Sequence, residues 1–292
     1  MPDSDMSGSP MRVLVTGAKG QLGHDVMASW GAAGDELLGT DLDELDITRR
    51  DQVHDVLVAW RPDVVVNCAA WTAVDACEGD SERAHLANGF AVRWVAEACD
   101  AIGARLVHIS TDYVFDGTKT TPYVETDEPN PQSVYGASKL MGEREALAIG
   151  DAATVVRTSW VCGAHGSNMV RTVQRLVAEN IPMSFVTDQV GHPTFTADLA
   201  PALRRLVVER VSGLVHVTNQ GAVSWYEFVR EVVRQLGADP DRVKPITTAE
   251  LDPPRPAARP ANSVLDNAVW RDLGWSLTRD FREPLADMLA GS

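Results

Sequence analysis

The chain has 292 residues, of which 45% are hydrophobic, a size that suits one large α/β domain or two unequal lobes. Its net charge of −15 and the lack of a basic block argue against nucleic acid as a partner, although arginines and backbone N–H groups can still hold a phosphorylated ligand. No apolar run approaches the roughly 18–20 residues of a membrane helix, and the four cysteines show no Cys-x-x-Cys spacing, so we expect a cytoplasmic protein with reduced thiols and no membrane partner.

The ordered part is predicted to begin after a disordered leader, residues 1–10. Residues 11–16 form a Val-rich strand, and Gly17, Gly20 and Gly23 follow it at the start of a helix. Glycines permit a tight turn and let the backbone approach a pyrophosphate, which the helix N-terminus stabilises. The loop therefore predicts a dinucleotide site, with an ordinary turn as the alternative.

A second strand, residues 36–40, is predicted to end at Asp41. An acid about 20 residues past a glycine loop is typical of a carboxylate bonded to the adenosine ribose, which favours NADH. Lys19 could instead meet a 2′-phosphate, so the choice between NADH and NADPH stays open. Asp46 and Ile47 follow in a turn, where they either border the adenine or, in the case of Asp46, cap the next helix.

The next strand, residues 62–70, is predicted after a helix at 51–60 and ends in small side chains. Small residues at a strand's carboxyl end leave room for a ligand in the crevice there. Ala69, Ala70 and Trp71 are therefore candidates to contact a cofactor.

Residues 72–75 are expected to continue this loop, and residues 82–102 to form one long amphipathic helix. Its predicted packing face consists of Ala84, Ala87, Ala91, Val95 and Ala98. A strand at 104–109 follows, and Thr111 and Asp112 lie at its carboxyl end. These polar groups can bond to a substrate carbonyl or hydroxyl, with strand-end capping as the alternative.

A helix is predicted over residues 135–148, after a loop at 115–131. It places Tyr135 and Lys139 four residues apart on one face. A nearby cation favours the phenolate and is expected to lower the pKa of the tyrosine, which would suit general acid–base catalysis. Taken alone the pair is weak evidence, because helices often combine Tyr with Lys.

The alternation of strands and helices, continued by a strand at 153–159, predicts an α/β fold with a Rossmann-type doubly wound parallel sheet. We expect a dinucleotide-binding domain over 11–160, with returning segments near 183–220. A smaller C-terminal lobe over 161–292 is expected to bind substrate and to be interleaved with the first domain.

Several features are expected within this lobe. A helix is predicted at 168–179, strands at 183–186 and 214–217, and a capping box at 224–227 that opens a helix to Leu236. Residues 245–260 hold five prolines and should be extended. Arg255 and Arg259 project from this segment and either bind phosphate or are simply solvated.

With these residues in place, the chain resembles the extended short-chain dehydrogenase/reductase superfamily, and within it the dTDP-4-dehydrorhamnose reductase family. The resemblance spans essentially residues 11–285. Its motifs lie at residues 15–23, 67–75, 110–117, 134–143, 157–161, 188–194 and 258–265.

The resemblance implies NADPH-dependent reduction of the 4-keto group of dTDP-4-dehydro-β-L-rhamnose, the last step of dTDP-rhamnose biosynthesis. It implies that Tyr135 protonates the sugar oxygen, that Lys139 holds the nicotinamide ribose and that Thr111 bonds the oxyanion. It also places Asp112, Trp160 and Arg259 at the substrate. The cofactor would be lined by Gly17, Gly20, Gln21, Leu22, Gly23, Asp41, Asp46, Ile47, Ala69, Ala70, Trp71, Tyr135 and Lys139.

The same resemblance allows NADH as well as NADPH, a monomer or a homodimer, and magnesium linked to dimerisation. The sequence itself offers no convincing magnesium ligands.

Two alternatives are weighed against this reading. A nucleotide-sugar dehydratase or epimerase is the nearest rival, but a dehydratase needs a carboxylate base after Thr111-Asp112, where this chain has Tyr113. A non-catalytic NADP-binding regulatory subunit would not need Tyr135 or Lys139, and both are present.

Overall fold

The central sheet consists of six parallel strands. The structure is a computed structural model that describes residues 9–291, so the predicted leader lies outside it except for Ser9 and Pro10. The strand order is β10-β5-β4-β3-β1-β2, and the doubly wound α/β prediction is confirmed. The bounds are β1 (Arg12–Thr16), β2 (Glu36–Thr40), β3 (Val64–Asn67), β4 (Arg105–Thr111), β5 (Ala153–Thr158) and β10 (Gly213–His216).

The direction of winding reverses at β1. The chain runs from β1 through α1 (Gln21–Ala32) to β2 on one side, and then through α2 (Arg50–Trp60) to β3 on the other side of β1. Connections that leave the carboxyl ends of β1 and β3 in opposite directions open a crevice between them.

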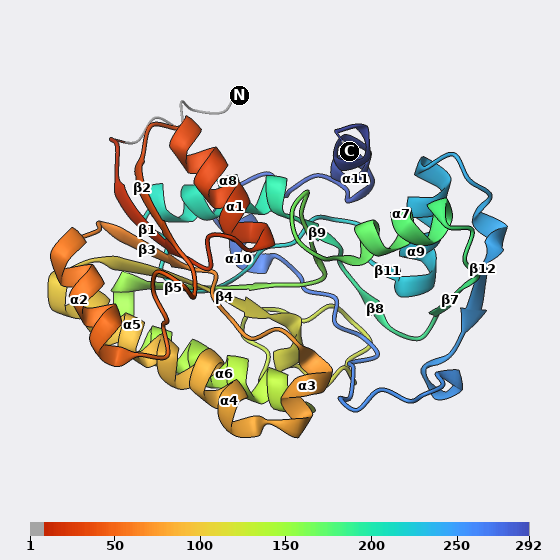
Figure 1. The fold of residues 1–292 in the computed structure, drawn as a ribbon, viewed down its shortest axis with the longest axis horizontal. Coiled ribbons are helices and arrows are strands. Elements are labelled where there is room, and N and C mark those ends of the chain that lie inside the picture. The colour runs from red at the N-terminus through yellow and green to blue at the C-terminus, as the bar shows by residue number, and fades with distance from the viewer. Residues whose placement is uncertain (1–8, 292) are drawn as a thin grey trace.

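Helices cover both faces of the sheet (Figure 1). Val13 and Val15 point to the side covered by α1 and α8 (Thr196–Val208), whereas Leu14 points to the side covered by α2, α5 (Ala91–Ile102) and α6 (Val134–Leu147). Successive side chains of a strand alternate between faces, so a strand buried on both sides reads as a continuous apolar run.

The predicted single helix over 82–102 is wrong in its middle. It divides into α4 (Ser81–His85), a π-helical turn η1 (Leu86–Phe90) and α5, and a further helix α3 (Val74–Gly79) stands in the expected loop. The π turn changes which residues face inward, so Asn88 and Gly89 are buried while Ala87 is partly exposed. The close approach of α6 leaves no space above Gly89, where a Cβ would lie 2.5 Å from Sδ of Met141.

The C-terminal lobe has its own apolar core, which includes Phe195, Phe228 and Phe281. Around it lie α7 (Met169–Ala178), α9 (Trp225–Gln235), α11 (Arg282–Ala290) and the parallel pair β7 (Met183–Val186) and β12 (Val243–Ile246). The predicted capping box is present, since Oγ of Ser224 accepts from the backbone N–H of Glu227 and the carboxylate of Glu227 accepts from that of Ser224.

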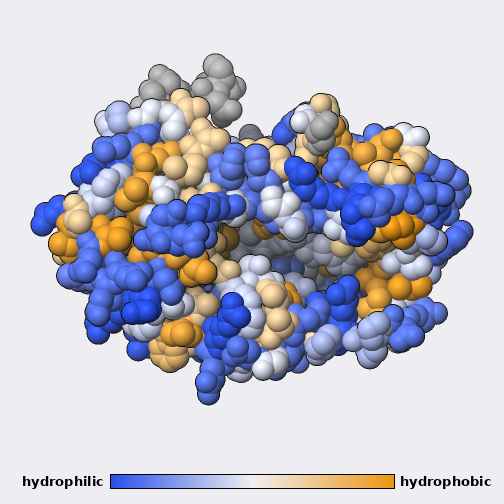
Figure 2. All heavy atoms as spheres, in the orientation of Figure 1, coloured by the Kyte–Doolittle hydropathy of each residue, from blue (hydrophilic) through white to orange (hydrophobic). Residues whose placement is uncertain are grey.

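Short segments join the lobe to the sheet. They are β6 (Val161–Cys162), paired with β9 (Thr194–Phe195), β8 (Val190–Gly191), paired with β11 (Val223–Ser224), and α10 (Ala268–Asp272). Figure 2 shows a hollow on the molecular face between the sheet half and the C-terminal half. None of the helices within residues 9–291 has both the length and the apolar character needed to cross a bilayer.

Candidate active site

A large cavity lies in the crevice between β1 and β3. It measures about 720 Å³, within the usual size range of small-molecule sites. The glycine loop, the end of β2, the end of β3 and the first turns of α4 and η1 all contribute to its wall. The lining residues are Gly17, Lys19, Gly20, Asp41, Leu42, Leu45, Asp46, Ile47, Thr48, Cys68, Ala69, Ala70, Trp71, Arg83, Leu86 and Ala87.

The glycines make this cavity possible. Gly17 has a φ of +68°, and a Cβ there would lie 2.8 Å from the backbone nitrogen of Ala69. A Cβ on Gly23 would lie 2.2 Å from the carbonyl oxygen of Gly17. Gly23 thus lets α1 pack against the loop and stands behind the cavity wall.

The polar groups that line the cavity after β2 are held by local hydrogen bonds. The carboxylate of Asp41 accepts from the backbone N–H of Lys19 at 3.0 Å, and Nζ of Lys19 donates to Glu44 at 2.8 Å. Asp46 accepts from the backbone N–H of Thr48 within a turn, and it lines the cavity. The alternative that Asp46 caps the next helix is wrong, because α2 begins at Arg50 with Arg49 as its N-cap and no side chain caps it.

Five of the predicted cofactor residues are not among those that line the cavity: Gln21, Leu22, Gly23, Tyr135 and Lys139. Oε1 of Gln21 accepts from the backbone N–H of Gly163 at 2.9 Å and from Nδ2 of Asn168 at 2.8 Å. Leu22 is buried in the core beneath the sheet. In this structure Gln21 anchors the loop after β6, and Leu22 holds α1 in place.

Tyr135 is buried in a small cluster that includes a wall residue of the large cavity and one of a smaller pocket. Trp71, which lines the large cavity, packs against this cluster, and Tyr113, which lines the smaller pocket, meets the ring of Tyr135 edge to face at 5.6 Å. Ser133 caps α6 by accepting from the backbone N–H of Gly136, so Tyr135 enters the first turn of the helix. The predicted general acid is thus buried beside a wall residue of each recess.

The predicted effect of Lys139 on Tyr135 is wrong for this structure. Burial raises the pKa of Tyr135 above its usual value, and the charge of Asp112 raises it further, while a hydrogen bond with Thr111 acts in the opposite direction. Burial also lowers the pKa of Lys139 to about 8, against the opposing influence of Glu143. Burial therefore shifts the pKa of each group toward its neutral form, although a lysine with a pKa of about 8 is still mostly charged at neutral pH.

Thr111 and Asp112 lie beside Tyr135 at the end of β4. Oγ1 of Thr111 donates to Asp112 at 3.0 Å and accepts from the backbone N–H of Tyr113, which is the capping alternative. Burial raises the pKa of Asp112 to about 6, although Ser263 and Thr111 hydrogen-bond to it. Asp112 thus takes up a proton more readily than an exposed carboxyl does, and its protonated form can donate a hydrogen bond as well as accept one.

The smaller pocket carries the other predicted substrate residues. It is lined by Tyr113, Trp160, Gln189, Trp225, Arg259, Pro260 and Ser263. The ring of Trp160 stacks on that of Trp225 at 3.6 Å. Arg259 forms a bidentate ion pair with Asp75, with distances of 2.5 and 2.7 Å, and Arg255 contacts the same carboxylate at 3.4 Å. The alternative that Arg259 is simply solvated is therefore wrong, since its side chain is mostly buried in this ion pair.

Sequence reasoning missed two residues that contact Trp71, one in the π turn and one in α4. The side chain of Asn88 accepts from the backbone N–H of Trp71 and donates to its carbonyl, and it also donates to Oγ of Ser138. The guanidinium of Arg83 lies 4.4 Å from the ring centroid of Trp71. A buried Asn on an otherwise apolar helical face was the available signal.

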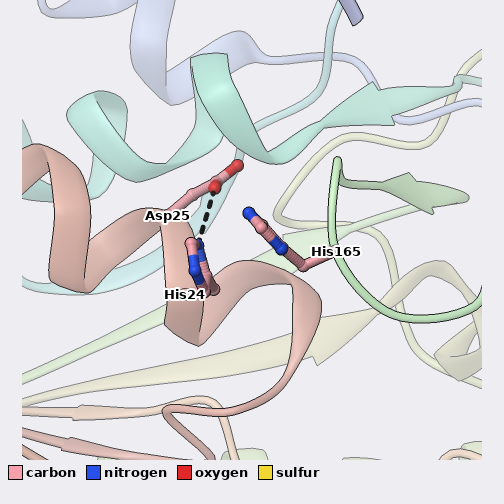
Figure 3. Close-up of side chains that lie close together, drawn as sticks. All are labelled: His24, Asp25 and His165. Atoms are coloured by element: carbon pink, nitrogen blue, oxygen red, sulfur yellow. Dashed lines mark ion pairs between the residues drawn. The ribbon is translucent and has the colours of Figure 1, made fainter. Parts of the chain in front are cut away.

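One potential metal cluster is found among the described residues, formed by His24, Asp25 and His165 (Figure 3). Asp25 and His24 lie in the first turns of α1, and His165 comes from the loop after β6. Magnesium prefers oxygen ligands, whereas this cluster offers two imidazoles and one carboxylate. These residues therefore do not fit the magnesium that the resemblance implied.

Comparisons with known proteins agree with this geometry. The family model of the RmlD substrate binding domain matches residues 11–292. The dTDP-4-dehydrorhamnose reductase of Mycobacterium tuberculosis is 42% identical over 291 residues, which cover 98% of this chain and 94% of that protein. A probable dTDP-4,6-dihydroxy-2-methyloxan-3-one 4-ketoreductase of Streptomyces antibioticus is 43% identical over 281 residues, covering 95% and 94%.

A solved structure gives the same picture. The dTDP-4-dehydrorhamnose reductase of Bacillus anthracis in complex with NADP superposes with a TM-score of 0.93 at 35% identity, covering 97% of this chain and 100% of that one. The match extends over the sheet, the glycine loop and the C-terminal lobe together. The chain therefore belongs to the RmlD family of dTDP-4-dehydrorhamnose reductases, which are oxidoreductases with a Rossmann-type fold.

Proposed function

We propose that this protein reduces the 4-keto group of dTDP-4-dehydro-β-L-rhamnose with NADPH, giving dTDP-β-L-rhamnose. The single observation that carries the proposal is the burial of Tyr135 in one cluster with Trp71 of the glycine-walled cavity and Tyr113 of the pocket of Trp160 and Arg259. A proton donor in that position can serve a ketone while a dinucleotide occupies the large cavity. Residues 161–292 then supply most of the substrate-binding lobe.

The large cavity suits a nicotinamide dinucleotide. The loop at Gly17 and Gly20 leaves backbone exposed at the N-terminus of α1, which favours a pyrophosphate. Asp41 and Lys19 lie where the adenosine ribose would bind, and Ile47 where the adenine would bind. The bound cofactor supplies the hydride for the reduction. Ala69, Ala70 and Trp71 would border its nicotinamide half.

The chain's own residues supply the proton. Tyr135 keeps its phenol protonated at neutral pH because its buried site favours the neutral form. It can therefore donate a proton to the sugar oxygen at carbon 4 as negative charge develops there. Thr111 beside it can donate a hydrogen bond to the same oxygen, and such preorganised donors stabilise an oxyanion.

Proton donation by Tyr135 leaves a phenolate, whose charge needs compensation. Lys139, one helical turn away, can carry a proton at neutral pH, since its pKa is about 8. Its ammonium stabilises the phenolate once that charge has formed, even though it does not lower the pKa of the resting tyrosine.

A second candidate substrate is another 4-keto dTDP sugar. The Streptomyces antibioticus relative, by its name, reduces a different 4-keto sugar, and it is as similar to this chain as the rhamnose enzymes are. The bidentate pair between Arg259 and Asp75 fixes one wall of the pocket without selecting a sugar ring.

The assay that tests the proposal mixes the protein with each 4-keto sugar and with NADPH or NADH, and follows the near-ultraviolet absorbance of the reduced nicotinamide. Fastest turnover on dTDP-4-dehydro-β-L-rhamnose with NADPH is expected. No turnover of any 4-keto nucleotide sugar, despite tight NADPH binding, would refute the enzyme and favour a regulatory binding protein.

Gly23→Ala should abolish NADPH binding, because its Cβ would force the glycine loop away from α1. Fluorescence titration with NADPH measures the loss. Gly31→Ala is the matched control on the same helix, where the nearest atom is the flexible Cδ1 of Leu37 at 3.4 Å, and it should bind normally. Equal affinity of the two variants would show that the loop does not bind the cofactor.

Asp41→Ser should raise the preference for NADPH over NADH. The carboxylate would repel a 2′-phosphate and bond a ribose hydroxyl, and its removal leaves one acidic group fewer beside Lys19, which is also paired with Glu44. The ratio of kcat/KM for the two cofactors measures the change, which we expect to be about tenfold or more. A ratio that does not move would place the ribose elsewhere in the cavity.

A further inference from the structure

A chain of buried polar side chains leads across the sheet to Lys139. Thr16, Asn67 and His108 stand directly opposite one another on the adjacent strands β1, β3 and β4. All three are essentially inaccessible to solvent, with exposures of 1%, 0% and 0%. Their neighbours on these strands are Val, Leu and Ile, so the three form a polar line through an apolar sheet.

Hydrogen bonds connect this line without a gap. Oγ1 of Thr16 donates to Oδ1 of Asn67 at 2.7 Å, and Nδ2 of Asn67 meets Nδ1 of His108 at 3.1 Å. Nε2 of His108 lies 3.4 Å from Nζ of Lys139, which also donates to the carbonyl of Ile109 at 2.6 Å. Buried polar groups that are fully paired hold one another rigidly.

His108 remains neutral in this setting. Burial, followed by the charge of Lys139, lowers the pKa of His108 well below its ordinary value. A neutral imidazole has one nitrogen that donates and one that accepts. Whether the nitrogen that faces Lys139 donates or accepts is therefore decided by the role of the nitrogen that faces Asn67.

The line can be satisfied in two ways. With Asn67 as the structure places it, Nδ1 of His108 accepts and Nε2 carries the proton, which suits a neutral amine on Lys139. If the amide of Asn67 is turned by half a turn, its oxygen instead of its nitrogen faces His108. The imidazole proton of His108 then lies on Nδ1, and Nε2 can accept from an ammonium on Lys139. Each charge of Lys139 thus matches one tautomer of His108, and the two states differ by the one proton that Lys139 releases.

We propose that His108, held by Asn67 and Thr16, is a positioning residue that orients Lys139 and that its tautomer follows the charge of Lys139. This inference deepens the proposed function, since it concerns the lysine that compensates the phenolate of Tyr135. The hydrogen bond between His108 and Lys139 would hold the amine in place in both charge states, with His108 as the acceptor from the ammonium and as the donor to the neutral amine.

Other groups also face Lys139 and act on its charge. Glu143 lies one turn further along α6 and is paired with Arg157 of β5, and Cys68 lies after β3. Tyr135 is one turn earlier on α6. These groups remain in place in every variant below, so a change in the titration of Lys139 reports on His108.

Lys139 can be observed directly, because the chain has only four lysines. Carbon-13 labelling of the lysine Cε atoms gives four signals whose positions follow the charge of each amine, and Lys139→Met assigns the one in question. His108→Leu removes an acceptor from the ammonium, and hydrogen bonds to charged groups are stronger than those to neutral ones. The titration midpoint of Lys139 should therefore fall, by about one pH unit.

Two controls accompany this variant. His192→Leu removes another buried histidine, whose ring contacts Thr218, and should leave the midpoint unchanged. His108→Gln restores a side-chain acceptor and donor and should recover most of the shift. A midpoint in His108→Leu equal to that of the wild type would overturn the proposal.

The wild type provides a test that needs no folded variant. Nitrogen-15 spectra of its seven imidazoles report the tautomer of His108 across the titration of Lys139. We expect the proton on Nδ1 below the lysine midpoint and on Nε2 above it, whereas one tautomer throughout would contradict the inference. Both measurements are made without substrate, so they stand apart from failure of the reductase assay.

Discussion

Tyr135→Phe should lower kcat by about 100- to 10,000-fold, the range that positioned general acids contribute. The phenol is buried beside Trp71 and Tyr113, which line the two recesses, and its buried site keeps it protonated. The ring remains in the variant, so its packing with Trp71 and Tyr113 is kept. Steady-state kinetics measures the loss, and fluorescence titration should show unchanged NADPH binding.

Tyr123→Phe is the matched control for this variant. Tyr123 is also buried and loses one hydroxyl, which donates to Asp116 at 2.9 Å far from the cavity. Its kcat should stay close to that of the wild type. If the two variants were equally active, proton donation would have to come from another group, and Tyr135 would have only a packing role.

Arg157→Met should reduce the free energy of unfolding by about 3–5 kcal/mol, a large part of the stability of a typical domain. The guanidinium forms two hydrogen bonds with Glu143, at 2.8 and 2.6 Å, and both side chains are 2% exposed. Removing Arg157 leaves the carboxylate buried without its cation, while Ser110 supplies only a hydroxyl at 2.6 Å. Chemical denaturation measures the loss.

Two further variants show whether burial of the ion pair is the reason for the large loss of stability in Arg157→Met. Arg93→Met breaks the ion pair with Glu145, which lies two residues from Glu143 on the same helix, but Arg93 is 43% exposed. That loss should be at most about 1 kcal/mol. Replacing Arg157 and Glu143 together, by Met and Leu, should recover much of the stability. Equal losses in Arg157→Met and Arg93→Met would contradict this account.

The sequence was informative about the fold because its apolar runs are continuous. Strands buried on both faces, such as Val64–Asn67, can be recognised from their own continuous apolar run. The glycine loop after β1 indicated the point where the winding of the sheet reverses. The capping box at Ser224 was equally readable, since it depends on residues three apart. These features are local, and local rules predicted them.

The electrostatics and pairings of the site were not readable in the same way. The pKa of Tyr135 depends on its burial, which comes from α3, α4 and the end of β4 rather than from Lys139 alone. The partner of Arg259 is Asp75, 184 residues earlier in the chain. The π turn at Asn88 makes contacts with Trp71 and α6, and such contacts between distant segments cannot be predicted from the spacing of apolar residues in the helix.

Tyr113 illustrates how a single position separates related reactions. It follows Asp112 where a dehydratase would need a carboxylate base, and burial raises its pKa to about 12. A phenol that stays protonated cannot remove a proton from carbon 5 of the sugar at neutral pH. The site is therefore suited to reduction without elimination of water.

The most direct test of the reductase proposal uses NADPH that carries deuterium on the transferred position of the nicotinamide. Incubation with dTDP-4-dehydro-β-L-rhamnose should place one deuterium at carbon 4 of the sugar, detected by mass spectrometry and NMR, and Tyr135→Phe should slow its appearance as much as it slows kcat. A product without deuterium at carbon 4, or an undiminished rate in Tyr135→Phe, would contradict the proposed reaction or the role of its acid.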